Sequence, residues 1–134
     1  MKKSKADTLQ KSLLIFVAIG LVPIALGYGL VPEKSLNYLF SISVTETNHA
    51  HIFRAVMGLY LALVLFWVIG AFNDQLRLPA LYSLVVFMFG LAAGRILSLI
   101  IDGMPNWLLV VYLALELFFG ILGLVVIKKT KDLE

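Results

Sequence analysis

The sequence predicts an all-α fold, a bundle of four transmembrane helices with a short interfacial helix between spans one and two. Hydrophobic residues make up 61% of the chain, charged residues 14%, and the mean hydropathy is +0.99, whereas a soluble domain is roughly half apolar and about a quarter charged. Four apolar blocks, separated by short polar segments, each approach the ~20 residues that cross a bilayer as a helix. Because four such spans use most of the 134 residues, we expect one transmembrane domain over residues 1–134.

The first span is expected at residues 12–30. It follows a lysine-rich segment, as the apolar core of a signal peptide does, but it is longer than the ~7 to 15 residues of such a core. Pro23, with Gly20 and Gly27 on either side, should kink this helix or let a neighbouring helix approach it closely. We therefore interpret this block as a transmembrane helix.

The segment 33–44 is too short and too polar to span a bilayer, yet its apolar residues recur at helical spacing. Leu36, Leu39 and Phe40 would share one face of a helix. A short helix with one apolar face typically lies in the interface between lipid and water. We therefore expect an interfacial helix here.

Turn and capping signals place the other three spans at 49–72, 79–101 and 106–127. Ser43 and Glu46 have the spacing of a capping box, which predicts that a helix begins close to them. Residues 73–77 are polar and are interpreted as a turn. Pro79 would then lie in the first turn of the third span, where its missing N–H costs nothing.

Basic residues are concentrated on one side of the predicted bundle. Four spans put both termini on the same side as the turn between spans two and three, and this side holds Lys2, Lys3, Lys5, Lys11, Arg77, Lys128, Lys129 and Lys131. The loops on the opposite side hold only Lys34. By the positive-inside rule, we expect both termini to be cytoplasmic.

Three charged residues, Arg54, Arg95 and Glu116, fall inside the predicted spans. A charge at the centre of a span costs ~2.5 to 3.5 kcal/mol, but each Leu, Ile, Phe or Val returns ~0.3 to 0.6 kcal/mol, so these apolar spans should still insert. At ~1.5 Å per residue, all three charges lie in the outer half of the membrane. Because a short turn joins their helices, we expect Arg95 and Glu116 to pair, and Arg54 could share the same carboxylate.

Four further polar residues would form the rim of the same site. Ser98 and Asp102 follow Arg95 on one helix face, and Tyr112 lies one turn before Glu116. His51 lies three residues before Arg54.

Two interpretations of this polar group remain open. In the first, the charges only fix helix packing, as in a structural or accessory subunit. Alternatively, they line an outward-opening pocket that binds a small anionic or amphipathic ligand, since ionisable groups in spans often mark sites. With Asp102 solvated at the rim, Arg54 and Arg95 outnumber Glu116, and this excess positive charge favours an anionic head group.

Other classes of function find little support in the sequence. With no cysteine, the chain has no thiol nucleophile and no thiolate metal site, and His49 and His51 would point to different faces of a helix. We therefore expect no catalytic residue, no cofactor and no metal. A nucleic-acid partner is not expected either, because no basic run is interleaved with aromatics. A small transporter would need more helices and hence a homo-oligomer.

Three motifs occur in order along the chain: Arg54-Ala-Val-Met-Gly58-Leu-Tyr60, then Gly90-x-x-x-Gly94-Arg95-x-x-Ser98-x-x-x-Asp102-Gly103-x-Pro105, then Leu115-Glu116. Their order and spacing resemble a widespread bacterial family of small four-helix membrane proteins, domain of unknown function four-three-four-five. The resemblance covers nearly the whole chain and implies four spans with these polar positions, but it brings no assigned activity. We expect the chain to lie in the bacterial inner membrane, surrounded by the lipid bilayer.

Overall fold

A computed structural model describes the backbone of residues 2–132 and the side chains of residues 4–132. The predicted all-α fold is confirmed, since the described residues form helices and loops without any strand. In chain order the helices are α1 (Lys2–Gly29), α2 (Pro32–Phe40), α3 (Thr47–Phe72), α4 (Asp74–Ile101) and α5 (Trp107–Lys131). The short helix α2 lies between the first two long helices, as the sequence predicts.

The four long helices are long and apolar enough to cross a membrane. Many of their large apolar side chains lie on the surface of the bundle, among them Phe16, Leu65, Val86 and Phe118. A soluble monomer rarely exposes so much continuous apolar surface, but lipid tails solvate it well. The protein is therefore a multi-pass membrane protein whose helices contact the lipid bilayer.

Helix α4 begins five residues earlier than expected. The side chain of Asn73 accepts hydrogen bonds from the backbone N–H groups of Gln75 (3.0 Å) and Leu76 (3.3 Å), so it caps a helix that begins at Asp74. The expected turn at residues 73–77 and the expected position of Pro79 in the first turn are both wrong. Pro79 lies inside a continuous helix.

Other helix ends also differ from the predicted ones. Glu46 is the N-cap of α3 but forms no side-chain cap hydrogen bond, so the predicted capping box does not form. Helix α2 ends at Phe40 rather than at residue 44, because Ser41 adopts a left-handed conformation with φ of 57°. Helix α5 continues to Lys131, about one turn past the expected end. The positive charges of the lysines in its last turn interact favourably with the negative end of the helix dipole and so stabilise this turn.

The glycines of α1 differ in what surrounds them. A Cβ at Gly20 would have nothing within 4 Å, whereas one at Gly27 would lie 3.2 Å from Leu39. The closest helix approach is at Gly29, where a Cβ would lie 2.9 Å from the carbonyl oxygen of Phe53. Close packing therefore occurs at the end of α1, and Gly20 faces open space.

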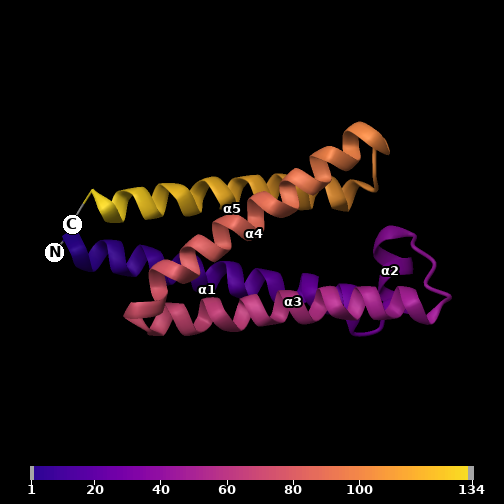
Figure 1. Cartoon of the computed structure of the whole chain (residues 1–134), viewed down its shortest axis with the longest axis horizontal. Coiled ribbons are helices and arrows are strands. Elements are labelled where there is room, and N and C mark those ends of the chain that lie inside the picture. Colours follow the sequence, from indigo (N-terminus) through magenta and orange to yellow (C-terminus); the bar gives the residue numbers. More distant parts are fainter. Residues whose placement is uncertain (1, 133–134) are drawn as a thin grey trace.

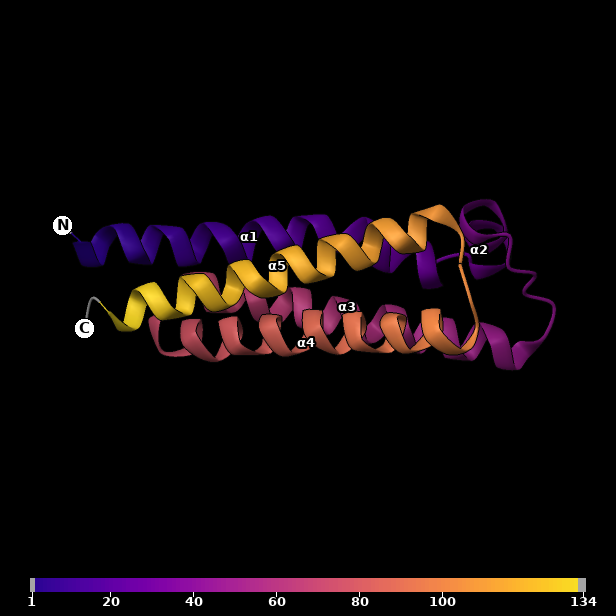
Figure 2. The ribbon, with the colours of Figure 1, turned by 90° about the horizontal axis from the view of Figure 1, so that it is seen from above.

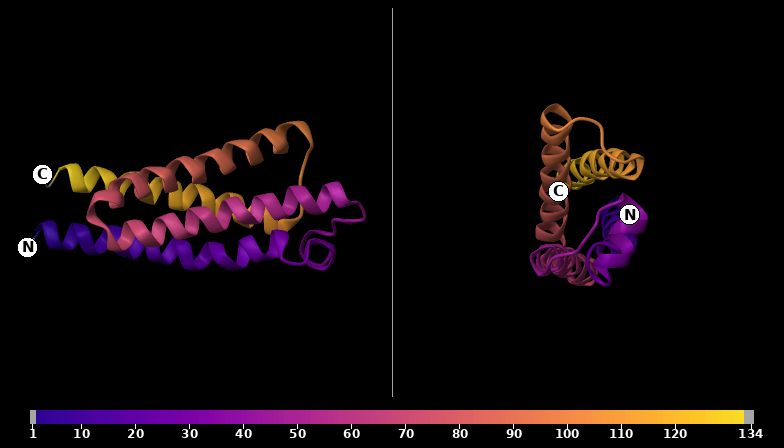
Figure 3. Two further views of the ribbon diagram at one scale, coloured as in Figure 1. Left: turned by 60° about the horizontal axis from the view of Figure 1, so that its bottom comes forward. Right: turned by 90° about the vertical axis from the view of Figure 1, so that its right-hand side faces the viewer.

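The helices form two antiparallel pairs, α1 with α3 and α4 with α5 (Figure 1). Both termini and the α3–α4 connection lie at one end, here called the terminal end, and α2 and the α4–α5 loop lie at the other, the α2 end (Figure 2). The two pairs are close together at the terminal end and diverge toward the α2 end (Figure 3).

Buried contacts hold the helices together at the terminal end. Trp67 is fully buried and donates a hydrogen bond to the hydroxyl of Ser83 (2.9 Å), which joins α3 to α4. Gly70 allows close packing against Ala80. The buried Arg77 forms an ion pair with Asp74 and another with Asp7 of α1 (3.5 Å), while Gln10 of α1 donates to Thr130 of α5. The two helix pairs are therefore well packed against each other at the terminal end, before they diverge.

Candidate functional site

The predicted pairing of Arg95 and Glu116 is confirmed. The Nε–H of Arg95 in α4 is shared between Oε1 (2.8 Å) and Oε2 (2.9 Å) of Glu116 in α5. Arg95 lies six residues before the end of α4 and Glu116 nine residues after the start of α5, so the antiparallel pair brings them to a similar depth. The side chain of Glu116 is 8% exposed and that of Arg95 21%. The carboxylate is thus enclosed, while part of the guanidinium is reachable.

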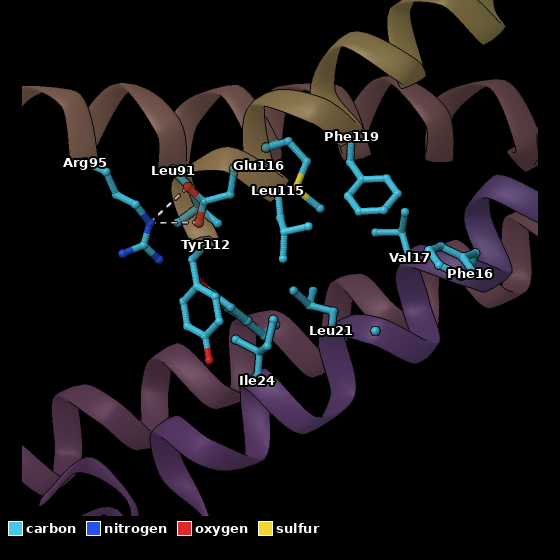
Figure 4. A pocket seen from close by; sticks show the side chains of 13 residues that line it. Phe16, Val17, Leu21, Ile24, Leu91, Arg95, Tyr112, Leu115, Glu116 and Phe119 are labelled. Carbon is cyan, nitrogen blue, oxygen red and sulfur yellow. Dashed lines mark hydrogen bonds and ion pairs between the residues drawn. The ribbon is translucent and has the colours of Figure 1, made fainter. Parts of the chain in front are cut away.

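This geometry leaves several N–H donors of Arg95 unused. Nε is directed at Glu116, so the two Nη atoms point away from the carboxylate (Figure 4). Nη2 is 3.4 Å from the hydroxyl oxygen of Tyr28 in α1, and Cζ lies 5.7 Å from the ring centroid of Tyr112. Within residues 4–132, Nη1 has no hydrogen-bond acceptor. Since a guanidinium carries five donors, it can still bind a ligand oxygen.

Tyrosine and phenylalanine rings surround the pair at the point where the helix pairs diverge. The ring of Tyr28 stacks on Phe40 of α2 (5.8 Å between centroids) and meets Tyr60 of α3 edge-on (5.6 Å). Phe40 in turn meets Tyr112 of α5 edge-on at 6.1 Å. Aromatic contacts of this kind contribute about 0.5–1.5 kcal/mol beyond the area that they bury. They link α1, α2, α3 and α5 beside the Arg95–Glu116 pair.

An apolar cavity of about 100 Å³ lies beside the pair, on its terminal side. The Arg95–Glu116 pair marks one end of the cavity, and the rings of Phe16 and Phe119, 5.8 Å apart between centroids, meet near the other (Figure 4). Apart from the pair and two tyrosines, the cavity is lined by Phe16, Val17, Gly20, Leu21, Ile24, Met88, Leu91, Leu115 and Phe119. The space therefore has one polar end and an apolar body. We call it the inner cavity.

A second cavity of about 80 Å³ lies on the opposite side of Arg95, toward the α4–α5 loop. Its lining includes Ser98, Gly103 and Pro105 as well as Arg95 itself. Arg95 lines both cavities. Its side chain therefore separates the apolar inner cavity from this second one, here called the loop cavity.

Ser98 and Asp102 lie beside the loop cavity rather than against the Arg95–Glu116 pair. The hydroxyl of Ser98 donates to Oδ2 of Asp102 (2.6 Å), and both side chains are exposed. Asp102 is the C-cap residue of α4. Ser98 lines the loop cavity and Asp102 is hydrogen-bonded to it, and neither forms a hydrogen bond with Glu116.

Arg54 and His51 do not join the site, contrary to the prediction from depth. Both side chains are exposed, and in the described part of the chain neither has a hydrogen-bond or ion-pair partner. The backbone of Arg54 lies against Gly29, the last residue of α1. The first turns of α3 therefore extend beyond the end of α1, and Arg54 is nearer the α2 end than counting from the start of α3 suggests. It forms no ion pair with Glu116, whose ion-pair partner is Arg95.

Two residues of the site were not predicted. Tyr28, close to the end of the first span, is buried and contacts Arg95. Tyr60, also buried, lines the inner cavity. Only Tyr60 has a signal in the sequence, because counting residues along its span places it at a depth close to that of Glu116. Among the described residues, no group of three or more histidine, aspartate or glutamate side chains could hold a metal ion.

Comparison with known protein families gives one match. The model of the family described as Domain of unknown function (DUF4345) matches residues 9–127. The chain belongs to this family. The match includes Arg95, Glu116, the tyrosines and both cavities, so the site lies within the family domain. No curated protein and no solved structure matches the chain.

Proposed function

We propose that this member of the family binds a small amphipathic ligand, with its polar head at Arg95 and its apolar part in the inner cavity. The observation that carries the proposal is the orientation of Arg95. One edge of the guanidinium is held by Glu116, and the free Nη donors lie where an apolar cavity ends. A planar donor group of this kind suits a carboxylate, ester or phosphate oxygen.

The position of Arg54 changes the charge argument for the ligand. With Arg54 outside the site, the inner charges are one arginine and one glutamate, which sum to zero. An anionic head is no longer needed to balance an excess charge. What the site still offers is a set of hydrogen-bond donors, so the amphipathic character of the ligand becomes more important than its net charge.

We further propose that the chain acts as a single domain in a bacterial inner membrane, with both termini cytoplasmic. The basic side chains near the terminal end support this orientation under the positive-inside rule. The α2 end, and with it the loop cavity, would then face outward. The loop cavity, on one side of Arg95, would then be the part of the site that opens to the outer face of the membrane.

A structural role is the main alternative, and one observation favours it. The Arg95–Glu116 pair joins α4 to α5, and the contact with Tyr28 adds α1, so the same groups could serve only to fix helix packing. The two functions differ in what they require of the inner cavity. Ligand binding needs it, whereas a purely structural pair does not.

Thermal-shift measurements in detergent can separate these functions. We expect lauric acid and lauryl alcohol to raise the melting temperature and dodecane to have a smaller effect, because only the first two present an oxygen to Arg95. The double variant Arg95→Gln/Glu116→Gln keeps the site neutral and should lose this preference. Arg54→Ala, outside the site, should keep it. Equal responses to all three compounds would contradict ligand binding at Arg95 and favour the structural role. A preference for the oxygen-containing compounds that is unchanged in the double variant would do the same.

A further inference from the structure

The inner cavity opens sideways, between α1 and α5. Its back wall is closed, since Tyr60 and Met88 are only 4% and 5% exposed. Its rim is open, because Phe16 of α1 and Leu115 of α5 are 65% and 42% exposed. Gly20 adds no side chain to this rim, and a Cβ there would have nothing within 4 Å. α1 packs mainly on α3, and α5 on α4, so the two helices that flank the opening cover each other little.

The opening faces lipid tails rather than water. Gly20 lies nine residues before the end of α1 at Gly29, which corresponds to about 14 Å along the helix axis. A bilayer has an apolar core of ~30 Å, so the rim lies near the middle of that core. A molecule that enters between α1 and α5 must therefore already be dissolved in the membrane.

The volume of the cavity limits how much of such a molecule it encloses. An engineered apolar cavity of about 150 Å³ binds a single benzene. The inner cavity, at about 100 Å³, would enclose a few methylene groups of one chain. The remainder of the chain would lie in the gap between α1 and α5, where apolar side chains line both sides.

Building on the proposed function, we propose that the ligand is a single-chain membrane amphiphile that enters laterally from the bilayer between α1 and α5. Its head accepts hydrogen bonds from the Nη atoms of Arg95. Its chain runs away from Arg95 toward the contact between Phe16 and Phe119. The loop cavity would hold water or part of the head group, not the chain.

Photo-crosslinking in vesicles tests this orientation directly. The probe is a long-chain fatty acid with a diazirine at the end of its chain, incorporated in phosphatidylcholine vesicles with the full-length protein. We expect adducts on Phe16, Val17 or Phe119 that an excess of oleic acid removes. Adducts on Leu109 or Leu113, which line the loop cavity, would overturn the lateral route but would keep ligand binding.

A portal variant provides the second arm of the test. Leu115→Trp should narrow the gap, because Leu115 is on its rim, and should lower crosslinking at least about fivefold. Leu124→Trp is the matched control, since Leu124 is similarly exposed on α5 (47%) but does not line the cavity. Equal crosslinking in both variants would contradict lateral entry. If the unmodified protein showed neither crosslinks nor a thermal shift, the proposed function itself would be contradicted.

Discussion

Arg95 donates its Nε–H to both carboxylate oxygens of Glu116, at 2.8 and 2.9 Å, and so keeps its two Nη groups directed away from the carboxylate. In this orientation the side chain of Arg95 can serve two roles. The Nε edge stabilises the α4–α5 pair, and the Nη edge remains able to bind a ligand.

Removal of either partner should destabilise the bundle. Glu116→Gln leaves the guanidinium without its counter-ion, and Arg95→Gln leaves an enclosed carboxylate, which typically costs about 3–5 kcal/mol. The double variant Arg95→Gln/Glu116→Gln should recover part of that loss. Unfolding in mixed micelles with increasing dodecyl sulfate measures all three variants. Strictly additive effects would contradict the pairing.

The glycines of the bundle should respond to substitution according to their surroundings. Gly29→Ala places a methyl group against Met57 and the backbone of Phe53, and such overpacking costs about 1–3 kcal/mol. Gly58→Ala introduces a methyl group where nothing lies within 4 Å, so the better helix propensity of alanine should make it neutral or slightly stabilising, by up to about 1 kcal/mol. Melting temperatures of the two variants give the comparison. Similar destabilisation of both would contradict the close approach of α1 and α3.

At the terminal end, Arg77 should matter more than its ion-pair partner. Arg77 is buried and also donates to the carbonyl oxygen of Ala71 (3.3 Å), so Arg77→Ala loses packing and hydrogen bonds together, with an expected cost of about 1–3 kcal/mol. The side chain of Asp74 is 85% exposed, and Asp74→Asn should cost less than ~1 kcal/mol. The same micelle unfolding assay compares them. A larger effect of Asp74→Asn would show that the ion pair dominates.

The proposed topology makes its own prediction. Because basic residues gather at the terminal end, a reporter fused after Glu134 should be cytoplasmic, and one inserted near Lys34 should be external. Alkaline phosphatase and green fluorescent protein fusions distinguish the two sides. An external C-terminus would reverse the bundle and turn the loop cavity toward the cytoplasm.

The sequence predicts the helices well because hydropathy is a local property. Each span and the helical segment between the first two follow from the periodicity and length of the apolar blocks. The Arg95–Glu116 pair could also be predicted, since a short turn forces α4 and α5 to be antiparallel neighbours. These features depend on a few residues close in sequence or on one connection.

Features that depend on how whole helices sit against each other could not be predicted. Counting residues placed Arg54 in the same half of the membrane as Glu116, close enough to share its carboxylate. In the structure α3 begins beyond the end of α1, and Arg54 is exposed and forms no ion pair with Glu116. The burial of Tyr28 requires the contacts with Phe40 and Tyr60, which come from α2 and α3. The inner cavity is lined by residues of α1, α3, α4 and α5, so it depends on the relative placement of four helices, which no local pattern encodes.

The central claim is that the inner cavity holds an amphiphile, and filling the cavity tests it most directly. Gly20 lines the cavity and has room for a larger side chain, whereas Gly58 has the same room but does not line it. Native mass spectrometry of the protein with oleic acid should show a bound amphiphile for the unmodified chain and for Gly58→Leu. For Gly20→Leu the affinity should fall at least about tenfold, equivalent to ~1.4 kcal/mol. Equal occupancy in all three proteins would contradict the account.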